Sequence, residues 1–263
     1  MPTSLYQALT EQLLPAWQQK RQLATPDNSL PQPTDRAQGY AAQKALFEAT
    51  GESAMGWKIA ATSIAGQQHI GVSGPLAGRL LTSRCLKPGA SINLTHNLMR
   101  VMEPEFAFRI GRDVLANSPL ALTTEEVMSH VQDLHLAIEI PDSRWQDFVH
   151  IGEAMLLADF ACANQLVLGE AVSYPWRDLD LSQHAVQVLK QGVVQAQGSG
   201  ANVLGDPRKA LAWLANELLS HGMHLRQGDT VITGTCVVPV VLNSGDDVLA
   251  DFGVFGTLGI QVA

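Results

Sequence analysis

The sequence has few charged residues, and that shortage narrows the range of functions. Only 16% of its 263 residues are charged, against roughly a quarter in ordinary soluble proteins. Its 17 Lys and Arg are scattered among 25 Asp and Glu, for a formal net charge of −8. Because no basic stripe is present, nucleic acid is excluded as a partner. Because charges are scarce, a carboxylate inside an apolar run stands out.

The chain also lacks a long hydrophobic run and a pairing pattern among its cysteines. The longest apolar run, residues 231–242, is broken by Thr and Gly and is too short to span a bilayer. No apolar leader follows Met1. Cys85, Cys162 and Cys236 are far apart and odd in number, which favours reduced thiols over a disulfide framework or a zinc site. We therefore expect a cytoplasmic protein without a membrane partner. Its 46% of hydrophobic residues are enough for a buried core.

The first 51 residues read as a small helical segment. Apolar side chains recur every four residues from Leu5 to Trp17, which predicts a helix that Pro15 should end or kink. Asp35 can cap a second helix, and Gly51 can close it.

From residue 56 onward, short apolar stretches alternate with turn residues. They predict strands at residues 57–61, 90–94, 101–110, 134–140, 165–168, 185–191, 230–235, 248–252 and 257–262. Two helices interrupt them, one begun by a capping box of Thr123 and Glu126 and one by Asp206 and Pro207. Because strands and helices do not alternate regularly, we expect an α+β fold, mixed and mostly β, rather than a doubly wound sheet.

Two of these strands carry acidic residues in apolar surroundings. Glu103 and Glu105 share one face of residues 101–110, about 7 Å apart, while the other face is apolar and should be core. Pro104 removes one ladder donor, which predicts a position at a sheet edge or beside a site. Glu139 lies near the end of residues 134–140. If the two strands are neighbours, three carboxylates converge, and such oxygen ligands suit Mg²⁺ or Mn²⁺.

Other interpretations of these residues stay open. Glu103 and Glu105 fit a solvated strand face, and Glu139 fits an ion pair with nearby Arg144. Lys58 lies in a short apolar strand, where its ammonium either reaches solvent or lines a pocket as an acid or base. The bend at residues 233–235 either offers donors to a small carboxylate or is a plain tight turn.

Two motifs point to other functions but are incomplete. Gly198 and Gly200 lack the full glycine spacing of a dinucleotide-binding loop, and no βαβ unit follows them. His221 and His224 have the spacing of a ligand pair, but they fall at a helix end, where a surface turn or a cationic cap is expected.

Five motifs, taken in order, resemble the fumarylacetoacetate hydrolase superfamily. They are Gly-Trp-Lys-Ile-Ala-Ala-Thr-Ser (56–63), Glu-Pro-Glu-Phe-Ala-Phe (103–108), Ala-Ile-Glu-Ile-Pro-Asp-Ser-Arg (137–144), Gly-Ser-Gly-Ala-Asn-Val-Leu-Gly-Asp-Pro (198–207) and Gly-Asp-Thr-Val-Ile-Thr-Gly-Thr (228–235). The resemblance covers nearly the whole chain. Within the superfamily, it is strongest to the group of 2-oxopent-4-enoate hydratases and 2-oxo-3-hexenedioate decarboxylases.

The resemblance implies a mixed, mostly β roll with a small N-terminal helical α/β lead-in, divided here as residues 1–85 and 86–263. It also implies Mg²⁺ or Mn²⁺ held by Glu103, Glu105 and Glu139, with Lys58 as the acid or base. The remaining site residues would be Ser63, Thr233 and Thr235 as substrate contacts, with Asp142 and Arg144 behind the ligands.

The activity implied is a lyase reaction, the addition of water to a 2-hydroxydienoate or 2-oxo-enoate in the catabolism of aromatic compounds. Decarboxylation of 2-oxo-3-hexenedioate is the second option. Hydrolysis of an acylpyruvate comes third, because the carbon–carbon hydrolases of this superfamily have Asp where Glu139 stands. A non-catalytic metal-binding subunit is the fourth. The resemblance also implies a homo-oligomer that could associate with a sister hydratase or decarboxylase.

Two positions depart from the hydratase pattern. Leu76 stands where hydratases often carry an acid, and Phe160 stands where relatives have Asn. Both departures predict a bulkier or less polar substrate, or a divergent activity.

Overall fold

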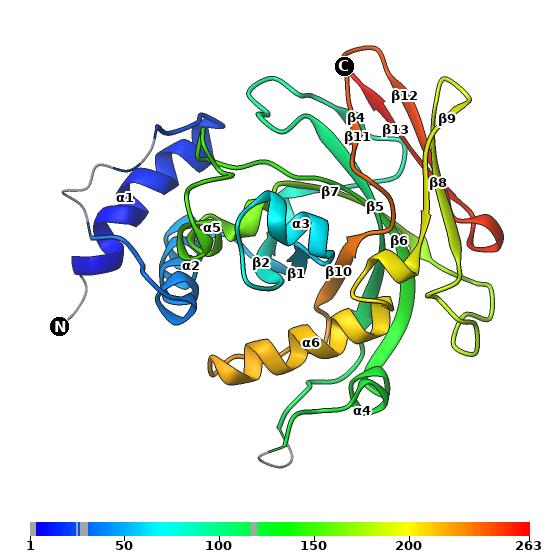
Figure 1. Ribbon diagram of the computed structural model, residues 1–263, viewed down its shortest axis with the longest axis horizontal. Helices are drawn as coiled ribbons and strands as arrows, with labels where there is room; N and C mark the ends of the chain where they lie inside the picture. The colour runs from blue at the N-terminus through cyan, green and yellow to red at the C-terminus, as the bar shows by residue number, and fades with distance from the viewer. Residues whose placement is uncertain (1–3, 25, 27–30, 117–119) are drawn as a thin grey trace.

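The computed structural model describes residues 4–24, 26, 31–116 and 120–263, so Met1 and the side chain of Leu5 lie outside the described part (Figure 1). Its helices are α1 (Ser4–Gln19), α2 (Arg36–Thr50), α3 (Ile64–His69), α4 (Thr124–Met128), α5 (Glu153–Ala158) and α6 (Pro207–Ser220), with 3-10 turns η1 (Thr82–Arg84), η2 (Phe160–Cys162), η3 (Gly200–Asn202) and η4 (Gly253–Phe255). Its strands are β1 (Ala54–Ala60), β2 (Leu76–Leu81), β3 (Cys85–Leu86), β4 (Ser91–Ile92), β5 (Val101–Ile110), β6 (Val131–Ile140), β7 (Gln165–Ala171), β8 (Ala185–Lys190), β9 (Val193–Ser199), β10 (Thr230–Thr235), β11 (Val240–Val241), β12 (Asp247–Asp251) and β13 (Thr257–Val262).

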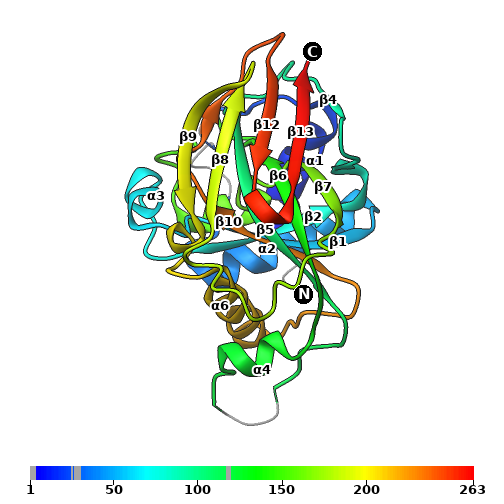
Figure 2. The same cartoon turned by 90° about the vertical axis from the view of Figure 1, so that its right-hand side faces the viewer.

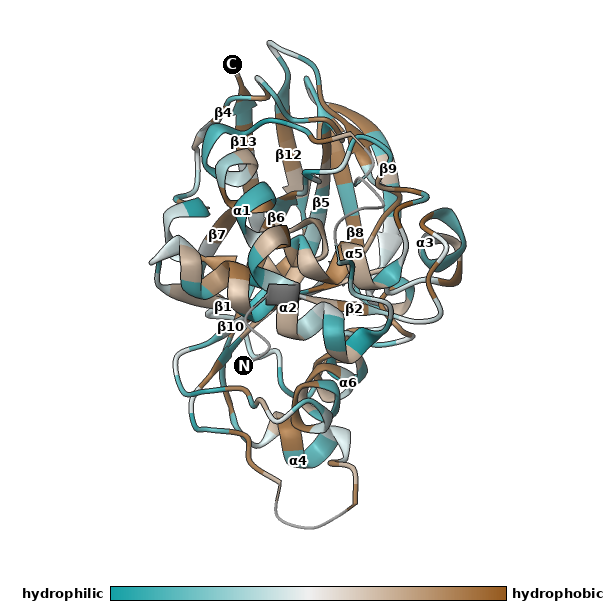
Figure 3. Ribbon diagram, turned by 90° about the vertical axis from the view of Figure 1, so that its left-hand side faces the viewer, coloured by the Kyte–Doolittle hydropathy of each residue, from teal (hydrophilic) through white to brown (hydrophobic). Residues whose placement is uncertain are grey.

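Helices α1, α2 and α5 lie together on one side of the molecule (Figures 1 and 3). Of the two outcomes predicted for Pro15, an end to the first helix or a kink in it, the first is wrong, because α1 continues past Pro15 to Gln19. Leu9, Leu13 and Trp17 are at most 3% exposed. Their burial, at about 1.5–3 kcal/mol per large apolar side chain, outweighs the roughly 3 kcal/mol that an interior proline costs.

No helix in the described part of the chain is long and apolar enough to cross a membrane.

The predicted helix ends are confirmed. The Asp35 carboxylate accepts a hydrogen bond from the backbone N–H of Gln38, and Gly51 closes α2 with a φ of 66°. Thr123 and Glu126 form the capping box of α4. The carboxylate of Asp206 accepts from the backbone N–H of Arg208 at the start of α6.

Two curled sheets form the rest of the fold, as the α+β expectation required. The larger has eight strands in the order β2-β1-β10-β5-β6-β7-β3, with β11 also pairing with β5. The smaller has the order β4-β13-β12-β8-β9 and lies on the side opposite α1 and α2 (Figures 1 and 2). Strands β1 and β2 belong to the larger sheet, so the predicted lead-in, residues 1–85, contributes directly to the sheet that carries β5 and β6.

The apolar face of β5 packs toward the smaller sheet. Phe106, Phe108 and Ile110 are at most 1% exposed, as predicted. The centroid of the Phe106 ring lies 5.4 Å from the ring centroid of Phe252 and 6.1 Å from that of Phe255. The opposite face of β5, with Glu103 and Glu105, therefore points away from this core.

Strand β5 is central, so the option that Pro104 marks a sheet edge is wrong. Pro104 lies between Met102, which pairs with β11, and Glu105, which pairs with β10. Its carbonyl accepts a hydrogen bond from the backbone N–H of Cys236 on that same side. The missing N–H therefore falls where β5 changes neighbours and no ladder donor is needed.

Candidate active site

The pairing of β5 with β6 brings the three carboxylates together. Glu103 lies directly opposite Glu139, and Glu105 lies opposite Ala137. One oxygen from each carboxylate lies within 4.8 Å of the other two. Glu105 and Glu139 are each 1% exposed and Glu103 is half-buried, so the solvated-face interpretation is wrong.

Lys58 supplies the cation at this cluster. Strand β1 carries it beside β10, and its Nζ lies 3.2 Å from Oε2 of Glu139. Its side chain is 3% exposed, so it does not reach solvent. The alternative ion pair of Glu139 with Arg144 is not formed, because Arg144 instead binds Asp142, with Nη2 2.5 Å from Oδ2.

The cluster is electrostatically strained. Burial is the largest influence, and it raises the pKa of all three carboxyls. The pKa of Glu139 is raised to about 7, with Lys58 opposing the shift and Glu103 adding to it. The pKa of Glu105 lies well above its usual value because its two acidic neighbours add to its burial. Burial lowers the pKa of Lys58, but the carboxylates reverse the effect and the net direction is upward.

The donor set fits a divalent cation. Three carboxylates and one ammonium leave two negative charges in excess, which such a cation would neutralise. Oε2 of Glu105 accepts from the backbone N–H of Gly234 at 2.6 Å. Oε1 of Glu105 and Oε1 of Glu139 are buried and have no hydrogen-bond partner among the described residues. A buried oxygen without a partner is costly, and a cation would satisfy both.

A large cavity opens beside the cluster. Its volume is about 680 Å³, and Lys58 and Glu103 form part of its wall together with Ser63, Gly234 and Thr235. Ser63 also caps α3 by accepting from the backbone N–H of Gly66. The Thr235 hydroxyl donates to the Val237 carbonyl.

Thr233 lies differently from Thr235. Its hydroxyl donates to the Phe106 carbonyl, its side chain is fully buried, and it is not among the residues that line this cavity. Gly234 between them has a φ of 111°, and an added Cβ would lie 2.2 Å from Oγ1 of Thr62. The bend therefore requires glycine for its conformation and for its close approach to Thr62.

The structure adds a wall that sequence reasoning missed. Phe160, Ala161 and Cys162 have φ values of 52°, 48° and 64°, three consecutive left-handed residues that are not glycine. Ala161 and Cys162 line the cavity. A Cβ added to Gly78 would lie 1.9 Å from the Phe160 carbonyl oxygen, so β2 packs directly against this turn. No local pattern in residues 160–162 signals such a conformation, because none of them is Gly, Asn or Asp.

The two departures noted in the sequence have different surroundings. Leu76 lines the cavity as an apolar wall residue. Phe160 is fully buried, and its ring lies 5.3 Å from that of Trp17 on α1. Phe160 is not among the cavity-lining residues, so its ring contributes to packing between η2 and α1.

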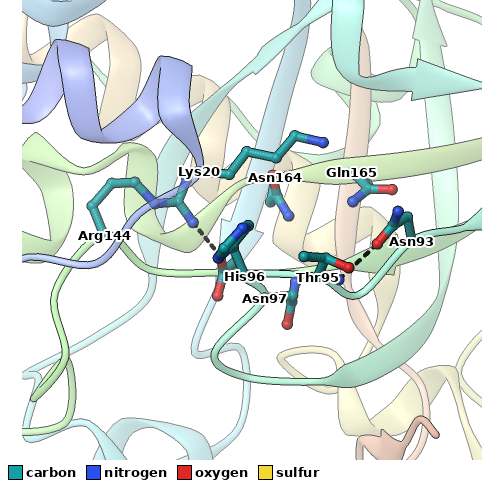
Figure 4. A pocket seen from close by; sticks show the side chains of 9 residues that line it. Lys20, Asn93, Thr95, His96, Asn97, Arg144, Asn164 and Gln165 are labelled. Carbon is teal, nitrogen blue, oxygen red and sulfur yellow. Dashed lines mark hydrogen bonds and ion pairs between the residues drawn. The ribbon is translucent and has the colours of Figure 1, made fainter. Parts of the chain in front are cut away.

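Asp142 and Arg144 lie at a second, very small pocket of about 10 Å³, roughly the room for one water. Figure 4 shows it gathering polar side chains from separate segments, including Lys20, His96 and Asn164. The Asp142 carboxylate accepts from the backbone N–H of Leu98 at 2.7 Å. The small pocket is thus a polar junction behind the cavity wall rather than a substrate site.

The chain is similar to known proteins over most of its length. The family model for the fumarylacetoacetate (FAA) hydrolase C-terminal domain matches residues 76–263. A 2-keto-4-pentenoate hydratase of Burkholderia vietnamiensis is 34% identical over 203 residues, 76% of each chain. A 2-hydroxyhexa-2,4-dienoate hydratase of Comamonas testosteroni is 32% identical over 219 residues, 82% of this chain and 81% of the other.

Among solved structures, 4-oxalocrotonate decarboxylase from Pseudomonas putida G7, complexed with magnesium and adipate, superposes with a TM-score of 0.88. It shares 23% identity and covers 100% of this chain and 99% of its own, so it shows a common fold. With the family model matching well over half of the chain, this protein belongs to the fumarylacetoacetate hydrolase family.

Proposed function

We propose that this protein is a divalent-metal-dependent hydratase, a lyase that adds water to a 2-hydroxydienoate or its 2-oxo-enoate tautomer. The observation that carries the proposal is the buried cluster of Glu103, Glu105 and Glu139 with Lys58, at the wall of a large cavity. Curated relatives at 32–34% identity bear hydratase names, which supports this reaction class in the catabolism of aromatic compounds.

The residues of the cluster would have two roles, metal binding and proton transfer. Glu103, Glu105 and Glu139 would hold Mg²⁺ or Mn²⁺, and the bound ion would supply electrophilic stabilisation of negative charge at the substrate's C2 oxygen. Lys58 holds a proton at Nζ and faces the cavity, so it can deliver that proton to C5 of the dienol and take up the proton that leaves the C2 hydroxyl, which gives the 2-oxo-3-enoate. Water then adds across the C3–C4 double bond, with its hydroxyl at C4 and its proton at C3.

Other groups at the site orient the substrate. The backbone N–H of Gly234 fixes Glu105, and the hydroxyl of Ser63 lies at the cavity wall, where it can donate to the substrate carboxylate. Thr235 lines the same wall, and its hydroxyl, which donates to the Val237 carbonyl here, would have to exchange that bond to contact the substrate. Thr233 would act by holding the bend through its bond to the Phe106 carbonyl. Asp142 and Arg144 would fix the segment that follows Glu139.

Decarboxylation is the second candidate, and the common fold with 4-oxalocrotonate decarboxylase favours it. The same carboxylate cluster serves both reactions, because both pass through an enolate at C2. A decarboxylase substrate carries a second carboxylate that leaves as carbon dioxide. Acylpyruvate hydrolysis and a non-catalytic metal-binding subunit remain further alternatives.

A spectrophotometric assay separates these reactions. Metal-stripped protein is offered 2-hydroxypenta-2,4-dienoate and 2-hydroxymuconate with and without Mg²⁺ or Mn²⁺. Metal-dependent loss of the diene absorbance with a hydrated product by mass supports the hydratase, whereas carbon dioxide release supports the decarboxylase. No turnover of any oxo-enoate in the presence of metal overturns both.

We also propose that the protein is cytoplasmic and assembles as a homo-oligomer, with association with a sister hydratase or decarboxylase as a further option. Light scattering of the purified protein measures the oligomeric state directly. The division at residue 85 remains a prediction. It is tested by whether residues 86–263 alone fold, which the shared sheet of β1, β2 and β10 argues against.

A further inference from the structure

The cavity is much larger than a pentadienoate needs. Its volume of about 680 Å³ falls within the range of roughly 300–1,000 Å³ that suits drug-sized ligands. The head of an oxo acid would occupy the end at Lys58 and Glu103. Most of the volume then lies beyond the reacting atoms and is available to a substituent at the far end of the substrate.

The wall around that volume is apolar. Lys58 and Glu103 are the charged residues lining the cavity, and both lie at the carboxylate cluster. The other basic residue among the lining residues is His69. The centroid of its ring lies 6.4 Å from that of Phe148, in an edge-on arrangement. Ile70, Phe148 and Met99 supply hydrocarbon surface. A distal carboxylate would therefore meet no Lys or Arg among the described lining residues, and only the imidazole of His69 could offset part of the cost of its desolvation.

The mouth of the cavity is apolar as well. Leu98 and Val238 line the cavity and are still 39% and 77% exposed. Exposed hydrophobic side chains from two separate segments thus line the cavity, an arrangement that marks a surface for recognising apolar ligands.

Hydrogen bonds to Asp142 hold the cavity-lining residues Leu98 and Met99 in position. Oδ1 of Asp142 accepts from the backbone N–H of Leu98 at 2.7 Å and from that of Met99 at 3.4 Å. Oδ2 of the same carboxylate binds the guanidinium of Arg144. The backbone of Leu98 and Met99 is therefore fixed before a ligand binds, which lowers the entropy cost of ordering this part of the wall.

We infer that the site selects acids with a single carboxylate and an apolar alkyl or aryl group, larger than methyl, at the far end. Leu98, Met99 and Val238 are the specificity-determining residues. The inference rests on the proposed function for the identity of the 2-oxo acid head. The inference goes beyond the proposed function because it names the group at the far end of the substrate and excludes a second carboxylate.

Binding of unreactive saturated analogues tests this without turnover. Calorimetry with the Mg²⁺-loaded protein compares 2-oxopentanoate, 2-oxooctanoate and the length-matched 2-oxooctanedioate. We expect affinity to rise about fourfold per added methylene and the dicarboxylate to bind at least about tenfold more weakly than 2-oxooctanoate. Affinity that does not rise with chain length, or a dicarboxylate that binds as tightly as the monoacid, overturns the inference.

A variant at the rim localises the effect. Val238→Asp should lower the ratio of 2-oxooctanoate to 2-oxopentanoate affinity about tenfold. Val254→Asp, at a similarly exposed valine in η4 that does not line the cavity, should leave the ratio unchanged. If Val238→Asp changes the mass by light scattering and leaves the ratio intact, the rim is a contact between copies and the inference fails.

The two proposals can fail separately. If 2-hydroxypenta-2,4-dienoate is hydrated but longer tails give no gain in kcat/KM or affinity, the hydratase stands and the inference is wrong. If long-chain 2-oxo acids bind more tightly but no dienoate is hydrated, the tail preference stands and the proposed reaction is wrong.

Discussion

Replacing Glu105 with Gln should move metal affinity and metal-free stability in opposite directions. Glu105 is 1% exposed and shares its site with two further carboxylates within 4.8 Å. Gln keeps the size of the side chain and an oxygen that can accept from Gly234, but it removes one negative charge. The variant therefore isolates the charge from the packing.

The size of the stability effect follows from proton linkage. At an effective dielectric constant of ~20, two ionised carboxylates about 5 Å apart repel by roughly 3.3 kcal/mol. In the metal-free protein, burial and the two acidic neighbours raise the pKa of Glu105 well above its usual value, so either this repulsion or the uptake of a proton opposes folding. For a group that is ionised in the unfolded chain, proton uptake at pH 7 costs at most about 3 kcal/mol. Gln has no such cost, so metal-free Glu105→Gln should be more stable by up to that amount.

The sign of the pH dependence is fixed by the direction of the shift. A carboxyl whose folded-state pKa is raised destabilises the fold only above its unfolded-state pKa. The advantage of Glu105→Gln should therefore be largest near neutral pH and disappear as the pH falls toward 4.5.

The assays are thermal unfolding of the metal-free proteins and calorimetric titration with Mn²⁺. A gain of up to about 3 kcal/mol corresponds to roughly 6–12 °C in Tm. Metal affinity should fall by more than about 100-fold. Changing a residue that only hydrogen-bonds to a metal ligand typically costs about 10–100-fold, and losing a charged ligand should cost more. A variant that binds Mn²⁺ as tightly as the parent, or whose metal-free form melts lower at pH 7, would refute the reasoning.

Three further predictions concern the same region. Lys58→Met should lower kcat by about 10²–10⁴-fold, and Lys58→Arg, which keeps the charge, should lose kcat while retaining more stability, as activity and unfolding assays will show. Burial, opposed by Arg144, raises the pKa of Asp159 to about 6 from 3.8. Between pH 4 and 7 the parent should therefore lose about 2.5 kcal/mol of unfolding free energy relative to Asp159→Asn in denaturant titrations; parallel curves would contradict this. Gly78→Ala places a Cβ against Phe160 and should cost about 1–3 kcal/mol, whereas Gly74→Ala, with open space around it, should cost little by thermal unfolding.

The sequence predicted best where the signals come from neighbouring residues. Residues 101–110, 230–235 and 257–262 were bounded correctly because glycine or aspartate marks a turn directly beside each of these stretches. The caps at Asp35 and Asp206 were correct because capping depends on neighbouring residues. The convergence of three carboxylates depended on one assumption, that two predicted strands are neighbours, which the pairing of β5 with β6 confirms.

The elements that were missed depend on distant contacts. Strands β2 and β9 were not predicted, nor were the short helices α3 and α5. Every residue of β2 except Arg79 is buried, so β2 shows no alternation that a periodicity argument could use. The sequence offered nearby Arg144 as one possible partner of Glu139, whereas the actual partner, Lys58, is distant in sequence and is placed there by the sheet. Thr233 and Thr235 share a motif, but their surroundings differ, because Gly234 turns the backbone between them.

The unfavourable features of this fold are concentrated around one cavity. The buried carboxylates and the left-handed residues Ala161 and Cys162 all border it or lie beside it. Left-handed non-glycine residues cost about 1–3 kcal/mol each, and buried like charges cost a similar amount. Stability alone would favour replacing both features, as Glu105→Gln and related changes would do. Their joint presence at a cavity that also holds Lys58 is therefore best explained by chemistry performed there, which requires excess negative charge for a cation and a wall shaped by strained backbone.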